Sequence, residues 1–166
     1  MKRVFNGSFT AQEPIPAEAI ALAVEVMQSG RLHRYNTVPG ETAETALLEL
    51  EFRDYIGARY CLAVASGGYA MATALRAVLL RHDEPVLTNA STLSPVPGAI
   101  AGAGGRPVFV ETTEDLVIDL EDLVRKATET KARLLLLSHM RGHIADMDAL
   151  MELCRSHRIS VIEDCA

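Results

Sequence analysis

The sequence has few of the features that mark secreted, membrane-bound or nucleic-acid-binding proteins. Its three cysteines are odd in number and lie within or beside apolar segments, which favours reduced thiols over a disulfide framework. No apolar run approaches the ~20 residues of a membrane span, and the first residues lack the apolar core of a signal peptide. A net charge of -6 argues against the basic patch that nucleic acids need. We therefore expect a cytoplasmic protein without membrane or nucleic-acid partners.

The chain does contain enough apolar residues for a folded core. Its 166 residues are about the length of one domain. A domain of this size typically buries roughly 68–70% of the surface of its unfolded chain. Hydrophobic residues make up 49% of the sequence, and we find no repeat, linker or low-complexity segment.

Residues 1–59 predict an arm followed by two helices. Residues 1–15 form the irregular arm, and Pro16 suits the first turn of a helix that should stop at Gly30. A polar loop leads to a second helix over about residues 42–55, which ends before Gly57.

Residues 60–166 predict an α/β domain. Short apolar runs alternate with longer amphipathic segments, and Asp119 and Asp146 stand where helix N-caps are expected. Continuously apolar strands separated by helices indicate a largely parallel sheet that is flanked by helices on both faces. The predicted strands are residues 61–65, 85–87, 107–110, 134–137 and 160–162, and the predicted helices are residues 69–80, 94–103, 119–129 and 146–157.

Polar residues follow every predicted strand. Right-handed crossovers place the carboxyl ends of parallel strands along one edge of a sheet, where ligands commonly bind. The sequence therefore predicts a polar site at this edge. The residues collected there are 66–68, 88–89, 111–112, 138–139 and 163–164.

The turn Ser66-Gly67-Gly68 leads from the first predicted strand into an apolar helix. Glycines let the backbone approach a ligand closely, and free amides at a helix N-terminus attract anions, so this turn is a candidate phosphate site. An ordinary tight turn would also use glycines, and the segment has neither of the two common nucleotide-binding fingerprints. The glycines at 102–105 precede a strand, which is typical of a helix stop.

Three readings are open for Asp164, which follows the last apolar run: a helix cap, a metal ligand or the partner of a cationic ligand group. His139 and His143 have the spacing of a helical metal pair, but the strand and glycine around them indicate a loop. We therefore expect no metal site. We place His139 in the floor of the crevice and assign Cys165 a packing role.

Several segments, in this order, resemble the DegT/DnrJ/EryC1/StrS family of sugar aminotransferases, which are fold-type-I enzymes dependent on pyridoxal phosphate (PLP). The resemblance covers about residues 16–166 and implies the N-terminal part of the large domain of these enzymes, with the rest missing. It is carried by LELEFRDYIG at 48–57, YCLAVASG at 60–67, TL at 92–93, PGAI at 97–100, GRPVFV at 105–110, HMRG at 139–142, DMD at 146–148 and VIEDCA at 161–166.

The resemblance implies a role for each candidate residue. The backbone amides of Ser66, Gly67 and Gly68 would cradle the phosphate of the cofactor. Asp164 would pair with the protonated pyridine nitrogen, and Leu93 would lie against the ring. Two positions depart from the family pattern: Gly68 stands where a threonine is usual, and Leu93 stands where an aromatic residue commonly stacks.

The lysine that forms the Schiff base in this family lies downstream of the VIEDCA motif. The three lysines of this sequence are Lys2, Lys126 and Lys131, and we expect all three to be solvated. The resemblance thus implies an aminotransferase part that is inactive by itself, with an amino-acid donor, a keto-sugar or similar ketone as acceptor, and a homodimeric assembly. The alternative is a non-catalytic binding or assembly domain of the same ancestry; a nucleotide-binding α/β domain is a weaker third reading.

Overall fold

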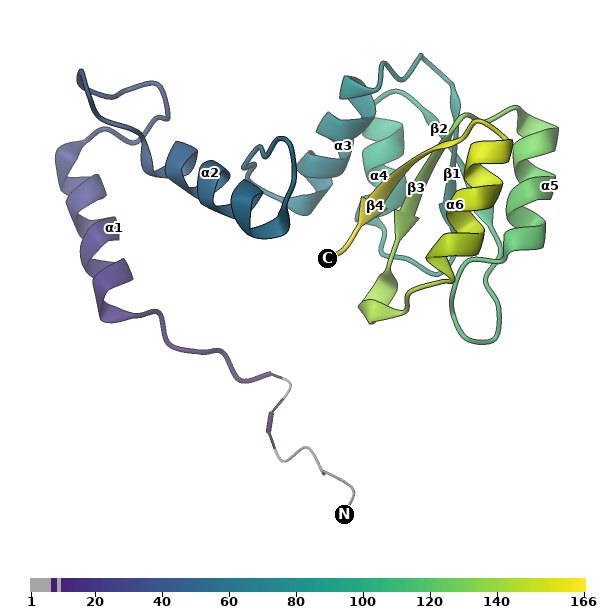
Figure 1. Cartoon of the computed structure of the whole chain (residues 1–166), viewed down its shortest axis with the longest axis horizontal. Helices are drawn as coiled ribbons and strands as arrows, with labels where there is room; N and C mark the ends of the chain where they lie inside the picture. The colour runs from purple at the N-terminus through teal and green to yellow at the C-terminus, as the bar shows by residue number, and fades with distance from the viewer. Residues whose placement is uncertain (1–6, 9) are drawn as a thin grey trace. The chain divides into compact units, whose positions relative to one another are not determined.

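The structure is a computed structural model of the chain, and it describes residues 7, 8 and 10–166. The described residues up to Ala63 form one compact unit, and Val64–Ala166 form a second. Figure 1 shows the helices of the first unit and the sheet of the second. No helix among the described residues is both long and apolar enough to cross a membrane.

The first unit contains helices α1 (Ala17–Ser29) and α2 (Glu44–Ile56), close to their predicted positions. Each helix ends at a glycine in the left-handed conformation, Gly30 with φ 70° and Gly57 with φ 67°, which L side chains rarely adopt. Neither N-terminus has a side-chain cap, and no residue of either helix is buried. The apolar stripes of these helices therefore remain open.

The second unit is built on a parallel sheet of four strands in the order β2-β1-β3-β4. The strands are β1 (Pro85–Asn89), β2 (Arg106–Val110), β3 (Leu134–Ser138) and β4 (Ser160–Asp164). Each contains one of the predicted strands and extends it by one or two residues. The parallel α/β fold predicted from the sequence is thus confirmed.

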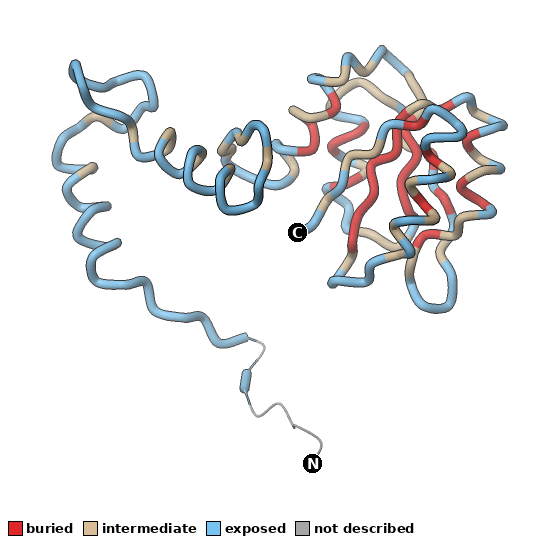
Figure 2. Tube along the Cα trace, viewed as in Figure 1, coloured by how far each residue is buried: buried red, intermediate tan, exposed pale blue. Residues whose placement is uncertain are grey.

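Helices cover both faces of this sheet (Figure 1), and Figure 2 shows that buried residues are concentrated in its strands. Helices α3 (Gly67–Ala77) and α4 (Pro95–Gly102) pack on one face, where Leu134 and Leu136 project. Helices α5 (Leu120–Thr130) and α6 (Met147–Ser156) pack on the other, where Leu135 and Leu137 project. Successive strand residues point to opposite faces, so one continuous leucine run serves two cores.

Local signals in the sequence fix the ends of three helices. The Asp119 carboxylate accepts the N–H groups of Glu121 and Asp122 at the start of α5, and Asp146 accepts the N–H of Ala149 at the start of α6. Both predicted N-caps are therefore confirmed. Helix α4 stops within the predicted glycine run at 102–105, where a Cβ on Gly105 would lie 2.9 Å from a methyl group of Leu80.

The strand predicted over residues 61–65 is wrong, because these residues form no hydrogen-bonded strand in the structure. The backbone there is not part of a ladder, and the N–H of Ala63 donates to the Glu49 carboxylate at 2.8 Å. A strand needs a neighbouring strand to satisfy its backbone groups. The apolar run signals hydrophobicity but not the presence of such a neighbour.

Candidate functional site

Strands β1 and β3 lie side by side, and their outgoing connections run to opposite faces of the sheet, β1 to α4 and β3 to α6. Such a switch point is where open α/β sheets bind ligands, outside the carboxyl ends of the strands. The two strands are joined there by Asn89, whose Oδ1 accepts the N–H of Ser138 at 2.9 Å and whose Nδ2 donates to the Ser138 carbonyl at 3.1 Å. Asn89 also donates to the Ser91 carbonyl at 2.8 Å. The floor of the site is therefore held by side-chain to backbone bonds across two strands.

Asp164 ends β4 at the same edge of the sheet. Its backbone carbonyl accepts the N–H of His139 at 2.9 Å, so the ends of β3 and β4 are tied together. Its carboxylate is half-buried and accepts the N–H of Ala166 at 3.3 Å. Because that single long bond leaves most of its acceptor capacity free, the carboxylate can receive a cationic donor from a ligand.

His139 is buried and stands directly after β3. Its Nε2 lies 3.0 Å from Oε2 of Glu163, the residue that precedes Asp164. His139 thus contacts β4 twice, through its ring and through its backbone N–H. The structure brings the predicted residues His139 and Asp164 together, although the role given to His139 stays a prediction.

The turn at residues 66–68 begins helix α3. The hydroxyl of Ser66 caps the helix by accepting the N–H of Tyr69 at 3.2 Å, a role that the sequence reading did not assign to it. The N–H groups of Gly67 and Gly68 have no acceptor among the described residues. A Cβ at either glycine would meet nothing within 4 Å. Two amides without a protein acceptor therefore lie at the positive end of the helix dipole.

Leu93 lies in the loop before α4 with 58% of its surface exposed. Two neighbouring threonines, Thr88 at 0% exposure and the half-buried Thr92, have hydroxyl oxygens that are buried without a hydrogen-bond partner in the described protein. Buried hydroxyls are normally paired, so these two oxygens are exceptions among the described residues. Their only signal in the sequence was the position of Thr88 at the end of a strand.

Some predicted residues are not joined by hydrogen bonds. No hydrogen bond within Val64–Ala166 joins the turn at 66–68 or Leu93 to Asp164. The Nδ1 of His143 lies 3.1 Å from the Asp115 carbonyl.

The packing role predicted for Cys165 is wrong, because this residue is exposed. It stands one residue beyond the end of β4. Partial burial raises the pKa of its thiol, and the carboxylates of Glu163 and Asp164 raise it further. Cys165 also lies close to His139 and Glu163, a grouping that the sequence reading missed because it depends on the pairing of β3 with β4.

A doubly wound parallel sheet with a carboxylate and free helix amides at its carboxyl edge defines an α/β domain that is suited to an anionic ligand with a cationic group. The family comparison is more specific. Residues 14–166 match the model of the DegT/DnrJ/EryC1/StrS aminotransferase family. The chain belongs to this family.

Two relatives carry the same name, dTDP-3-amino-3,4,6-trideoxy-alpha-D-glucose transaminase. The one from Micromonospora megalomicea subsp. nigra is 33% identical over 90% of this chain and 38% of its own length. The one from Streptomyces venezuelae is 35% identical over 94% of this chain and 39% of its own length. This chain therefore spans about two-fifths of the length of these relatives.

Solved structures share the fold. The E. coli GDP-4-keto-6-deoxy-D-mannose-3-dehydratase, solved with bound hydrated PLP, superposes with a TM-score of 0.77 at 19% identity, over 94% of this chain and 40% of its own. At this identity the likeness shows the fold alone.

The residues present fit PLP. Its phosphate needs backbone donors, which Gly67 and Gly68 leave free, and its pyridine nitrogen needs an acid such as Asp164, whose carboxylate has spare acceptor capacity. A Cβ on Gly68 would meet nothing within 4 Å, so the turn leaves room beside this residue.

Proposed function

We propose that this chain is the N-terminal part of a PLP-dependent aminotransferase that moves an amino group from an amino-acid donor to a keto-sugar or a similar ketone. The observation that carries the proposal is the half-buried carboxylate of Asp164, which ends β4 with His139 bonded to its backbone. Membership of an aminotransferase family supports it.

In this proposal each residue of the site has one task. The N–H groups of Gly67 and Gly68 bind the phosphate, and Ser66 fixes the first turn of α3 so that these groups point outward together. Asp164 holds the proton on the pyridine nitrogen through a charge-assisted hydrogen bond. When bound, PLP supplies an electron sink for the carbon that carries the amine.

Two further contacts orient this machinery. His139 sets the direction of Asp164, because its backbone N–H holds the Asp164 carbonyl while its ring contacts Glu163. Leu93 covers one face of the cofactor ring by dispersion, without the aromatic face common at this position in the family.

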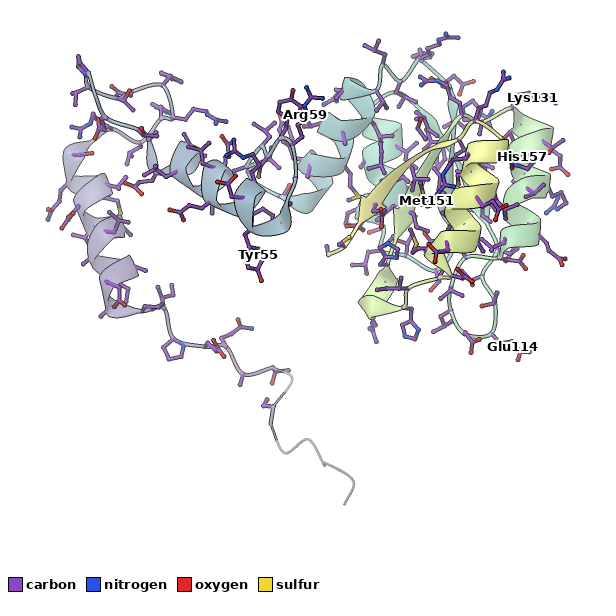
Figure 3. All side chains as sticks on the ribbon, viewed as in Figure 1. Tyr55, Arg59, Glu114, Lys131, Met151 and His157 are labelled. Carbon is purple, nitrogen blue, oxygen red and sulfur yellow. The ribbon has the colours of Figure 1, made fainter. Side chains whose placement is uncertain are left out.

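The lysines of this chain are poorly placed for the chemistry. Lys131 is the exposed residue that ends α5 shortly before β3 begins, so it lies at the amino end of the sheet, away from Asp164. Figure 3 shows Lys131 and His157 at the end of this unit opposite to Glu114. Lys126 lies on α5, and Lys2 falls outside the described residues. We therefore propose that the amine comes from outside these 166 residues and that this chain alone does not transfer amino groups.

The remaining assignments follow the family. We propose a keto-sugar acceptor because the two named relatives are amino-sugar transaminases. We also propose that the protein is cytoplasmic. We propose a homo-oligomer because α1 and α2 bury none of their residues within this chain. The division into an arm with two helices at 1–59 and a partial PLP domain at 60–166 stays a prediction.

The test is to determine the mass of the intact gene product and to assay it for amino transfer to keto-sugars in the presence of PLP. We expect a product longer than 166 residues that is active, whereas the chain 1–166 is inactive in the same assay. Amino transfer catalysed by chain 1–166 alone, or an intact product with neither cofactor absorbance nor activity, would contradict the proposal.

A second candidate is a non-catalytic binding or assembly domain of the same ancestry. It is favoured by the loss of two cofactor contacts, at Gly68 and at the exposed Leu93, and by the positions of Lys126 and Lys131. The two candidates differ in the intact gene product. If the intact product shows cofactor absorbance and a variant without a downstream lysine does not, the result would support the aminotransferase over the binding domain.

A further inference from the structure

A second group of ligating side chains lies beside Asp164. It consists of the buried His139 and the exposed Glu163 and Cys165, which meet because β3 and β4 pair in parallel register. One ring nitrogen, one carboxylate oxygen and the sulfur all lie within 4.8 Å of one another. The proposed aminotransferase chemistry uses neither Glu163 nor Cys165 as a ligand.

The donor set has the chemistry of a transition-metal site. Imidazole, carboxylate and thiolate are the three ligand types of protein zinc sites, and three protein ligands leave a fourth position for water. Tetrahedral zinc with ordinary bond lengths separates its ligand atoms by about 3.3–3.6 Å. The His139–Glu163 pair lies at 3.0 Å and the sulfur lies within 4.8 Å of both atoms, so a bound ion would require the exposed side chains of Glu163 and Cys165 to adjust.

The surroundings suit a cation. His139 is held rigidly, because it is buried and its backbone N–H is bonded to the Asp164 carbonyl. The Glu163 carboxylate brings negative charge into the group, which favours a bound cation.

The site is separate from the contact assigned to Asp164. Residues two apart in an extended chain project to the same side, so Glu163 and Cys165 lie together while Asp164 between them projects to the other. The Asp164 carboxylate is correspondingly absent from the group and bonds instead to the N–H of Ala166.

From this geometry we propose that His139 Nε2, Glu163 and Cys165 Sγ bind a divalent transition metal, with Zn²⁺ as the preferred ion, and that the ion ties the end of β4 to the end of β3. The Cys165 thiol proton is released to solvent on binding, and the imidazole proton moves to Nδ1 so that Nε2 can coordinate. This inference does not depend on the proposed aminotransferase function.

The test uses chain 1–166 without an affinity tag, stripped of metal and kept reduced, and titrated with Co²⁺ as a spectroscopic substitute for Zn²⁺. We expect one equivalent to bind and to give the thiolate-to-cobalt charge-transfer band, and Zn²⁺ to abolish that band by displacement. Cys165→Ser should remove the band. Glu163→Gln, which keeps the size of an exposed side chain, should weaken binding at least about 10-fold, as losses around metal sites do.

Matched controls separate this site from other thiols and imidazoles. Cys61→Ser and His143→Ala should leave the band and the affinity unchanged, and far-UV circular dichroism should confirm that every variant is folded. The proposal is overturned by the absence of a charge-transfer band, by a band that survives Cys165→Ser, or by one that disappears in Cys61→Ser. If the Glu163→Gln variant binds Co²⁺ with wild-type affinity, the carboxylate is not a ligand and the three-ligand assignment is overturned.

Discussion

Strand β3 and helix α2 show opposite extremes of burial in one chain. All five residues of β3 are buried, including the polar Ser138, whereas none of the thirteen residues of α2 is buried. Both segments are rich in leucine, so composition does not explain the difference. The sheet has helices on both faces, whereas apolar residues of α2 such as Leu48 and Phe52 are exposed in the described part of the chain.

The contrast indicates which part of the chain contributes most to the stability of the protein. Burial of apolar side chains is the main favourable term in folding, and it is concentrated in the sheet and its four helices. The apolar residues of α1 and α2 can contribute fully only when a further surface covers them. We therefore expect substitutions in the second unit to change stability more than matched substitutions in the first.

The largest effect is expected for Leu135→Ala in β3, which is 0% exposed. Removing a buried leucine side chain leaves a cavity and typically lowers the free energy of unfolding by about 2–5 kcal/mol. Leu48→Ala in α2, where the leucine is 56% exposed, should change it by about 0.5 kcal/mol or less. Urea unfolding followed by circular dichroism measures both variants. Equal losses in the free energy of unfolding would contradict the difference in burial between β3 and α2.

The next effect concerns Asn89, the side chain that bridges β1 and β3. Asn89→Ala leaves the backbone N–H of Ser138 buried without its acceptor, which typically costs about 1–3 kcal/mol. Asn36→Ala in the exposed loop between α1 and α2 is the matched control and should be almost neutral. Wild-type stability of the Asn89 variant would mean that this bridge does not hold the two strands.

Helix capping gives a smaller contrast. Asp119 caps α5, and Asp119→Ala should lower the free energy of unfolding by about 1 kcal/mol. Helix α2 has Ala43 at its N-cap, so Ala43→Asp should add a cap and raise helical content. Circular dichroism and urea unfolding measure the pair. A loss of helix in the Ala43 variant would contradict the assigned start of α2.

The smallest effect is a pH dependence carried by Glu84. Its burial favours the neutral acid, but hydrogen bonds from the Arg133 guanidinium and the Arg81 N–H outweigh burial and lower its pKa. A carboxyl whose pKa is lowered by folding stabilises the protein above its unfolded pKa of about 4.3, and this contribution is lost as pH falls through the folded pKa.

Glu84→Gln should therefore flatten the fall in melting temperature between neutral and acidic pH. Glu41→Gln is the control from the first unit, where a hydrogen bond from Arg31 lowers the pKa of a more exposed carboxyl. The Glu41 change should alter the slope less, because solvent screens that pair. If both variants change the slope of melting temperature against pH equally, the two units do not differ in how strongly solvent screens these ion pairs.

The sequence was informative where a local signal decides the structure. Asp119 and Asp146 start their helices, Gly30 and Gly57 end theirs, and four apolar runs lie within the four strands. Periodicity, caps and glycines act within a few residues, so they can be read from the chain alone.

The failures all depend on contacts between distant segments. Residues 61–65 have the composition of a strand but no neighbouring strand, and Cys165 is exposed because no distant segment of the described chain packs over it. The Asn89 bridge and the grouping of His139 with Glu163 follow from the strand order β2-β1-β3-β4, which differs from the order in the chain. The edge of the sheet that carries the site was predictable, but the partners of each side chain were not.

The most direct test of the functional account is the rate of amino transfer by the intact gene product carrying Asp164→Asn, compared with Asp115→Asn in an exposed loop of the same unit. With PLP, an amino-acid donor and a keto-sugar acceptor, Asp164→Asn should lower kcat by about 100-fold or more, because the amide no longer provides the charge that holds the pyridine proton. Asp115→Asn should retain the wild-type rate. A wild-type rate in the Asp164 variant would contradict the role that this account gives to the end of β4.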